Sequence, residues 1–228
     1  MGMMQLGKKI FGDNKGAISF ALSLYNHLPF NNSRKIKGNN NRLDFSDSLL
    51  KKSRIVIKGN DNQIILGSRC TLRHCSIYIS GNGNVVHLGD KVAMLSGEIH
   101  IEDNGNEINI GSHTSFLGKT HLACIEGTKI TIGQDCLFSS DVTLRTGDSH
   151  AITDLDGKRI NASKDITLAD HVWVGNRAII TKGVSIAKDS VLATGAILTS
   201  AITSPNVVIG GVPAKVIKQG INWNINRK

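Results

Sequence analysis

The chain has 228 residues, of which 40% are hydrophobic and 20% charged, as expected for one soluble globular domain with a small appendage. Aromatic residues make up only 4%, and 3 prolines stand against 24 glycines, which argues against a core built on large rings. The net charge of +9 favours an anionic partner, yet basic residues form no long run and do not alternate with aromatics, which argues against nucleic acid.

The amino-terminal region is predicted to form one short helix over 14–28, with Ile18, Leu22 and Tyr25 on one face. The mildly apolar stretch 17–30 is too short and too polar to span a membrane, so we expect at most peripheral membrane contact. None of the 4 cysteines belongs to a C-x-x-C pair, which predicts buried, reduced thiols in a cytoplasmic protein.

A repeat follows the helix. An aliphatic–glycine pair recurs every 22 residues, at Leu66-Gly67, Leu88-Gly89, Ile110-Gly111 and Ile132-Gly133. Turns rich in Asn and Gly precede the first three pairs, and a weaker copy at 38–41 places the first coil near residue 34. Further on, aliphatic residues recur every six positions, at Leu168, Val174, Ile180, Ile186, Leu192 and Leu198, with Ile166 two residues before the first, so that three units make a coil of 18.

Short strands joined by tight corners at a fixed period predict an all-β, parallel β-helix in which the inward aliphatics stack from coil to coil. The alternative, an antiparallel sandwich, has no reason to hold a register of 22 and then change to 18. We expect a helical or capping segment over 1–33, the β-helix over 34–212 and a carboxy-terminal helix or tail over 213–228. A short helix is predicted to close the chain between Lys215 and Trp223.

The repeat breaks once. The pairs Ile132-Gly133 and Leu168-Ala169 lie 36 residues apart, so a loop over about 145–164 must leave the solenoid. This loop carries His150, and histidine is the side chain that most often serves as general base for a hydroxyl. Asp148 is expected either to orient that imidazole or to cap a turn.

The loop Gly147-Asp-Ser-His150, the coil His171-Val-Trp-Val-Gly175 and the ending Gly210-Gly-Val-Pro-Ala-Lys215 resemble bacterial hexapeptide-repeat O-acetyltransferases with a left-handed β-helix. The resemblance covers roughly residues 55–220 and is greatest to enzymes that modify capsule and lipopolysaccharide sugars, including polysialic acid. It implies acetyl-CoA as donor, a glycan acceptor, and a homotrimer with active sites between subunits. It also implies His150 as general base and Trp173 at the donor and acceptor site.

The same resemblance implies which residues lie along acetyl-CoA. They are Trp173, Gly175, Lys182, Thr194, Thr199 and Lys215, the last near the CoA phosphates. Relatives often read Thr-Lys-Asp where this chain has Thr199-Ser200-Ala201, so Lys182 or Lys188 is expected to replace the missing lysine. Small-sugar acetyltransferases have an asparagine near the position of His121. The sequence therefore leaves open which polar side chain takes part in the site at that position.

Three other functions remain open on the sequence. An N-acetyltransferase acting on a nucleotide-linked amino sugar would share the donor site. A metal-dependent enzyme of the carbonic anhydrase type would need His113, His121 and His150 to converge, but the close histidine–acid spacings of that class are absent, so no metal is expected. A non-enzymatic scaffold would have no reason to interrupt its repeat with a histidine-bearing loop.

Overall fold

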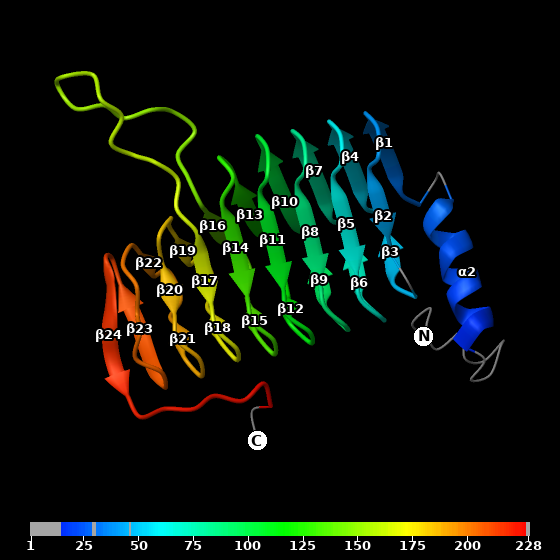
Figure 1. Ribbon diagram of the computed structural model, residues 1–228. Helices are drawn as coiled ribbons and strands as arrows, with labels where there is room; N and C mark the ends of the chain where they lie inside the picture. The colour runs from blue at the N-terminus through cyan, green and yellow to red at the C-terminus, as the bar shows by residue number, and fades with distance from the viewer. Residues whose placement is uncertain (1–14, 29–30, 46, 227–228) are drawn as a thin grey trace.

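The computed structural model describes residues 15–28, 31–45 and 47–226. These residues form a left-handed parallel β-helix in which successive strands along the chain enter three different sheets in turn (Figure 1). The fold predicted from the repeat is therefore confirmed, together with the protruding loop and the amino-terminal helix.

We name the three faces of this prism sheets A, B and C. Sheet A contains β1 (Ser33–Lys37), β4 (Arg54–Lys58), β7 (Ser76–Ser80), β10 (Gly97–Glu102), β13 (Thr120–Cys124), β16 (Val142–Arg145), β19 (Ile179–Ile180) and β22 (Ile197–Leu198). Sheet B contains β2 (Arg42–Asp44), β5 (Gln63–Leu66), β8 (Val85–Leu88), β11 (Glu107–Ile110), β14 (Lys129–Ile132), β17 (Ile166–Leu168) and β20 (Ser185–Ile186). Sheet C contains β3 (Leu49–Lys51), β6 (Thr71–Arg73), β9 (Ala93–Leu95), β12 (Ser115–Phe116), β15 (Leu137–Phe138), β18 (Trp173–Val174), β21 (Val191–Leu192), β23 (Val207–Gly211) and β24 (Ala214–Gln219).

The core is a set of aliphatic columns that run along the solenoid axis. Ile57, Ile79 and Ile101 pair in register across β4, β7 and β10, and all three are 0% exposed. Each such side chain stabilises the fold by about 1.5–3 kcal/mol through burial. The fully buried rings of Phe116 and Phe138 stack with centroids 4.5 Å apart, so even the few aromatics in the core follow the same column geometry.

The corner between sheets A and B carries the extra residues of the longer coils. Here Asn62, Asn84 and Asn106 are buried and form a ladder, because each side-chain amide donates to the Oδ1 atom of the preceding asparagine at 3.0 Å. The ladder continues into Thr128, whose Oγ1 atom donates to Thr146 Oγ1 at 2.7 Å. Thr146 is the first residue of the protruding loop, so the loop leaves the solenoid where this ladder ends.

Helix α2 (Lys15–His27) lies against β3, the first strand of sheet C. Asn26 is buried there and bonds to the Ser48 carbonyl at 2.8 Å and to the Leu50 amide at 2.9 Å, so it satisfies backbone groups at the open end of the solenoid. Of the predicted amino-terminal segment, residues 1–14 and the side chain of Ile18 lie outside the described residues. No helix in the described part of the chain is long and apolar enough to cross a membrane.

The predicted carboxy-terminal helix is wrong. Residues 214–219 form β24, which pairs antiparallel with β23 at the far edge of sheet C. That edge would otherwise expose unpaired backbone groups, and a returning strand satisfies them where a helix cannot. The strand after the reversal also packs Val216 against the core. The tail then runs back along the solenoid, where Trp223 Nε1 donates to the His171 carbonyl at 2.8 Å (Figure 1).

Replacing a rung of the asparagine ladder tests this account of the corner. Asn84→Ala leaves buried donors and acceptors of Asn62 and Asn106 without partners, which costs about 1–3 kcal/mol for each unsatisfied group. Chemical denaturation should show this loss. Asn82→Ala, the matched control, removes an exposed amide from the outside of the same turn and should cost under about 1 kcal/mol. Equal losses for the two variants would contradict a ladder that stabilises by burial.

Candidate active site

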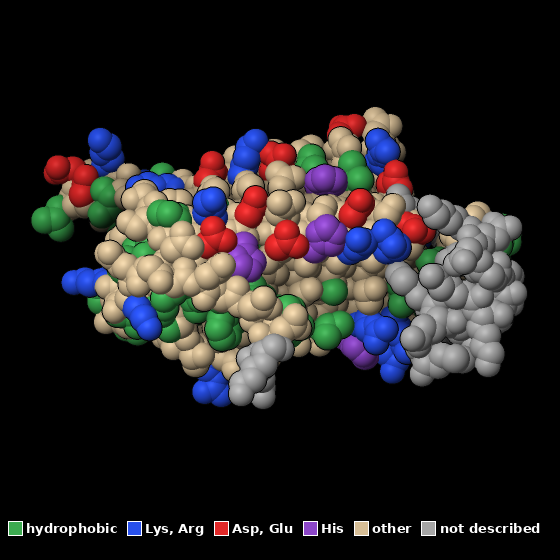
Figure 2. Space-filling view, turned by 90° about the horizontal axis from the view of Figure 1, so that it is seen from below, with side chains coloured by type: hydrophobic (Ala, Val, Ile, Leu, Met, Phe, Trp, Pro, Cys, Tyr) green, Lys and Arg blue, Asp and Glu red, His purple; other side chains and the backbone are tan. Residues whose placement is uncertain are grey.

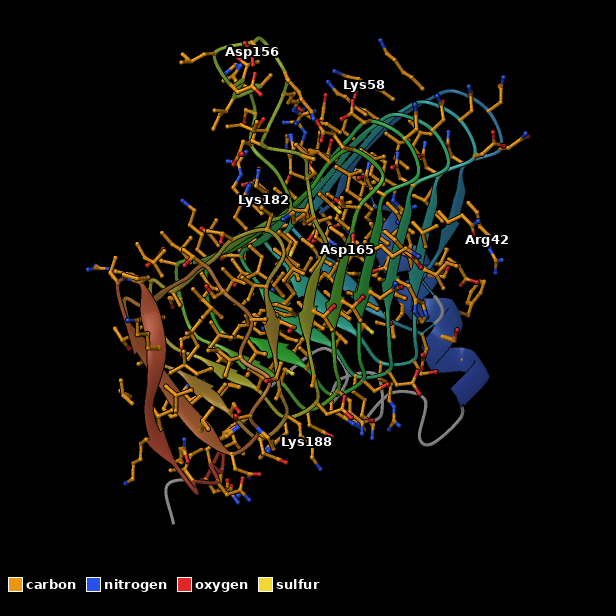
Figure 3. The ribbon with its side chains drawn as sticks, turned by 60° about the vertical axis from the view of Figure 1, so that its left-hand side comes forward. Arg42, Lys58, Asp156, Asp165, Lys182 and Lys188 are labelled. Carbon is orange, nitrogen blue, oxygen red and sulfur yellow. The ribbon has the colours of Figure 1, made fainter. Side chains whose placement is uncertain are left out.

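The loop over 146–165 connects β16 in sheet A to β17 in sheet B and projects from the corner between them (Figure 1). Its tip is a small hairpin in which Ile160 N donates to the Ile152 carbonyl at 2.8 Å. Figure 3 shows Asp156 at this tip and Lys182, from the coil below, at the base. The side chain of His150 is exposed between tip and base, and so can reach a molecule outside the solenoid.

Asn161 holds the part of the loop that contains His150. Its side chain is only 7% exposed, and its Nδ2 atom donates at 2.8 Å both to the His150 carbonyl and to Asp148 Oδ2. Its Oδ1 atom accepts from the Ile152 amide at 2.8 Å. One buried amide therefore fixes the backbone on both sides of His150, a role that no local pattern in the sequence indicates.

Asp148 is engaged in the same network. Its carboxylate accepts from Lys182 Nζ at 2.5 Å and from Asn161 at 2.8 Å, and these two bonds, that from Lys182 first, lower the pKa of Asp148. Asp148 thus helps to hold the loop in place. Among the described residues, its carboxylate is bonded to Lys182 and Asn161 and not to the His150 imidazole.

Lys182 ties the loop to the solenoid. It lies two residues after the end of β19, and its Nζ atom also donates to the Asn161 carbonyl at 2.8 Å. A second anchor lies in the turn between β13 and β14, where Arg159 pairs with Glu126 at 2.7 Å and the Ser163 amide donates to Glu126 at 3.3 Å. The lysine expected at a CoA phosphate is therefore already committed to a carboxylate and a carbonyl.

A groove of about 510 Å³ lies at the base of the loop and contains three of the residues singled out from the sequence. It is lined by Arg145, Gly147, Asp148, Ser149, Ile179, Ile180, Thr181, Lys182 and Thr199. Arg145 was not among the sequence candidates. Its position as the last residue before the repeat breaks is the signal that could have found it.

Trp173 lies elsewhere, on the outer face of sheet C. Its indole is 38% exposed, and its Nε1 atom donates to Ser139 Oγ at 3.3 Å. The ring of Trp223 from the tail lies 6.0 Å from it and stacks on His171 at 4.2 Å. Trp223, like Arg145, was missed, because nothing local predicts that the tail returns along sheet C.

The tail and sheet C enclose a second groove of about 410 Å³. It is lined by His113, Ser115, Gln134, Asp135, Cys136, Leu137, Asp170, His171, Trp223, Asn224 and Ile225. It therefore lies beside Trp223, on the side of the molecule away from His150.

The sequence candidates consequently fall at separate places in one chain. The corner that carries His150 lies opposite sheet C in the prism, so Trp173 and His150 do not meet within a chain (Figure 1). Gly175 and Thr194 lie at the corner between sheets C and A, where a Cβ atom on Gly175 would lie 2.6 Å from the Thr194 amide. The close approach of the two coils explains that glycine. Lys215 is exposed on β24 at the end of the solenoid.

The three histidines of the metal hypothesis also lie apart. His121 on sheet A contacts Glu98 at 3.1 Å, and His113 at the corner between sheets B and C lies 3.5 Å from Asp135. Figure 2 shows histidine, acidic and basic side chains in bands along the face seen from below. Within the described residues, no group of three histidine, cysteine or acidic side chains is placed to hold a metal ion.

No family model matches the chain. A polysialic acid O-acetyltransferase of Neisseria meningitidis is 32% identical over 189 residues, which cover 82% of this chain and 87% of that protein. A polysialic acid O-acetyltransferase of Escherichia coli O1:K1 / APEC is 40% identical over 95 residues, or 41% of this chain and 31% of that protein. The chain also matches 48% of the galactoside O-acetyltransferase of Escherichia coli K12 at 34% identity. It thus spans less than half the length of these two Escherichia coli relatives.

Two solved structures extend the similarity to most of the fold. The polysialic acid O-acetyltransferase OatWY superposes with a TM-score of 0.80 at 30% identity and covers 86% of this chain and 92% of its own. The polySia-specific acetyltransferase NeuO gives a TM-score of 0.76 at 30% identity, over 87% of this chain and 91% of its own. Sequence and fold are both similar over most of the chain, and the chain belongs to the hexapeptide-repeat O-acetyltransferases of the polysialic acid type.

Proposed function

We propose that the protein transfers an acetyl group from acetyl-CoA to a hydroxyl of a bacterial surface polysaccharide, either capsule or lipopolysaccharide. Sialic acid-containing glycans are the leading acceptors, because the relatives with the broadest match are polysialic acid O-acetyltransferases. The observation that carries the proposal is an exposed histidine whose backbone a buried asparagine holds rigidly beside a groove. Acetyl-CoA as the donor and the four buried free thiols are both consistent with a cytoplasmic location.

In the proposed reaction, His150 accepts the proton of the sugar hydroxyl while that oxygen attacks the thioester carbonyl. The new C–O bond forms, the C–S bond breaks, and the imidazolium returns the proton to the departing CoA sulfur. General base catalysis of this type contributes about 10²–10⁴-fold. A backbone N–H would stabilise the oxyanion of the tetrahedral intermediate. The Asp148 carboxylate serves the loop anchor, so it positions the base indirectly.

The active site is proposed to form between two subunits of a homotrimer. His150 and Trp173 lie on opposite sides of one chain, so a neighbouring copy is needed to bring the two together. The loop also exposes Ile152, Leu155 and Ile160, at 54%, 106% and 63%. Exposed apolar side chains on a projecting loop favour contact with a second protein surface, which would also exclude water from the reaction.

The donor is proposed to lie with its pantetheine arm against Trp173 and its phosphates near Lys215. Both side chains are exposed, and Lys215 lies on β24 away from the loop anchor. Gly175 and Thr194 would line the path between them, whereas Thr199 lies in the groove at the base of the loop. Lys188 is exposed too, with its Nζ atom 3.9 Å from Asp189, whereas Lys182 is held by Asp148. The role at the phosphates therefore falls to Lys215 rather than to Lys182.

Removing the proposed base is the direct test of the chemistry. His150→Ala should lower acceptor-dependent thiol release from acetyl-CoA by about 10²–10⁴-fold without unfolding the protein. His87→Ala, an exposed histidine on sheet B, serves as control and should keep the full rate. The protein's own thiols should not disturb the readout, because burial raises the pKa of Cys75 and of Cys136 to about 11. Undiminished turnover in His150→Ala would rule out this base.

Asn161 should matter through position alone. Asn161→Ala frees the backbone around His150, so kcat should fall at least about tenfold while KM for acetyl-CoA stays unchanged. Hydrogen exchange of the amides over 148–164 should become faster in the same variant. Asn109→Ala on sheet B is the matched control and should alter neither quantity. Unchanged exchange in the loop of Asn161→Ala would contradict the anchoring role.

The intersubunit site predicts complementation. His150→Ala and Trp173→Ala should each be nearly inactive alone, but co-expressed chains should regain activity. A trimer that contains both variants has one interface at which an intact His150 meets an intact Trp173, so random assembly restores about a quarter of all interfaces. Size-exclusion chromatography with light scattering should give the mass of three chains. A monomer, or mixtures with no recovery, would contradict the shared site.

A further inference from the structure

The groove at the base of the loop has an uncompensated positive charge. Three ionisable side chains line it, Arg145, Asp148 and Lys182. Asp148 and Lys182 neutralise each other through their 2.5 Å contact. Among the described residues, Arg145 has no carboxylate within salt-bridge distance and is bonded to a hydroxyl, Ser149 Oγ, at 3.1 Å. The groove therefore presents one free cation.

The other arginine and lysine at the loop base differ from Arg145 in this respect. Arg159 is bonded to Glu126 at 2.7 Å, and Lys182 to Asp148. Both therefore stabilise the loop itself, whereas Arg145 has donors to spare. A guanidinium with free donors matches a carboxylate in a two-bond fork, a geometry that a lysine cannot provide.

The surroundings of Arg145 suit a sugar. Thr181 and Thr199 supply hydroxyls, and Ile179 supplies an apolar surface that is 38% exposed. Arg145 also ends β16 only five residues before His150, so a ligand held by its guanidinium lies at the root of the loop that carries the base. A ligand with a carboxylate on one side and hydroxyls on the other fits this arrangement.

We propose that Arg145 binds the carboxylate of an acidic sugar unit and so selects carboxylate-bearing acceptors for acetylation. The inference rests on the proposed function, since it assigns the groove to the acceptor. Ser149 Oγ takes one hydrogen bond from the guanidinium, which leaves its other N–H donors for a ligand in the groove that Arg145 lines. The class of acceptor is thus a glycan of sialic or uronic acid type, and a neutral glycan lacks the group that this arginine requires.

The test compares oligosialic acid with its methyl ester, in which each carboxylate is replaced by an uncharged ester group. With the native protein, KM should be lower for the acid. Arg145→Gln should raise KM for the acid at least about tenfold and leave KM for the ester and for acetyl-CoA unchanged. Arg145→Lys should recover part of the difference, because it keeps the charge and loses the fork. Arg73→Gln, an exposed arginine on sheet C, is the control and should have no effect.

Three results of this kinetic comparison would overturn the inference. A raised KM for acetyl-CoA in Arg145→Gln would assign Arg145 to the donor phosphates. An equal rise in KM for the acid and for the ester would give Arg145 a purely structural role. A native protein with the same KM for acid and ester would have no selectivity for the carboxylate. Calorimetric titration with oligosialic acid separates this inference from the proposed reaction. Binding that the native protein shows and Arg145→Gln loses supports the carboxylate site even where no acetyl group is transferred, and binding that survives in Arg145→Gln refutes it.

Discussion

The parallel pairing of each strand with its counterpart one coil further along is the constraint on which the rest of the structure depends. Ile132 pairs with Leu168 although 36 residues separate them, as closely as Ile110 pairs with Ile132 across 22. Inserted residues can therefore leave the solenoid only at a corner. The corner between sheets A and B first takes the extra residues of the long coils and then the whole loop that carries His150. The loop that carries His150 is thus an enlarged form of a corner that the amino-terminal coils already have.

A loop outside the core needs its own support, and here it is polar. The two ion pairs at its base are partly exposed to solvent, and such pairs contribute at most about 1 kcal/mol each. The buried amide of Asn161 is a stronger constraint, because leaving its partners unsatisfied away from water is costly. The network also determines which charges remain available. Since Asp148 and Lys182 are used in holding the loop, the free charge at the groove is that of Arg145.

Much of the fold could be predicted from the sequence because periodicity is a local signal. The coils, the change of period and the position of the loop follow from spacings such as that between Leu88 and Ile110. Contacts across the loop could not be predicted, since Asp148 and Lys182 are 34 residues apart and meet only through the path of an irregular segment. The carboxy-terminal helix was predicted wrongly because helix propensity depends on neighbouring residues in the sequence. It carries no information about the edge of β23, with which this segment pairs as β24. Trp223 was missed for the same reason.

In the proposed reaction, an acetyl group passes from acetyl-CoA to a hydroxyl oxygen of an acidic surface glycan. Mass spectrometry of oligosialic acid, before and after incubation with the protein and acetyl-CoA, tests that claim most directly. The account predicts the added mass of acetyl groups, present only with active protein and removed by mild alkali, as an ester is. An added acetyl group that resists alkali would indicate an amide, and unmodified oligosialic acid beside an acetylated neutral or amino sugar would contradict the assigned acceptor.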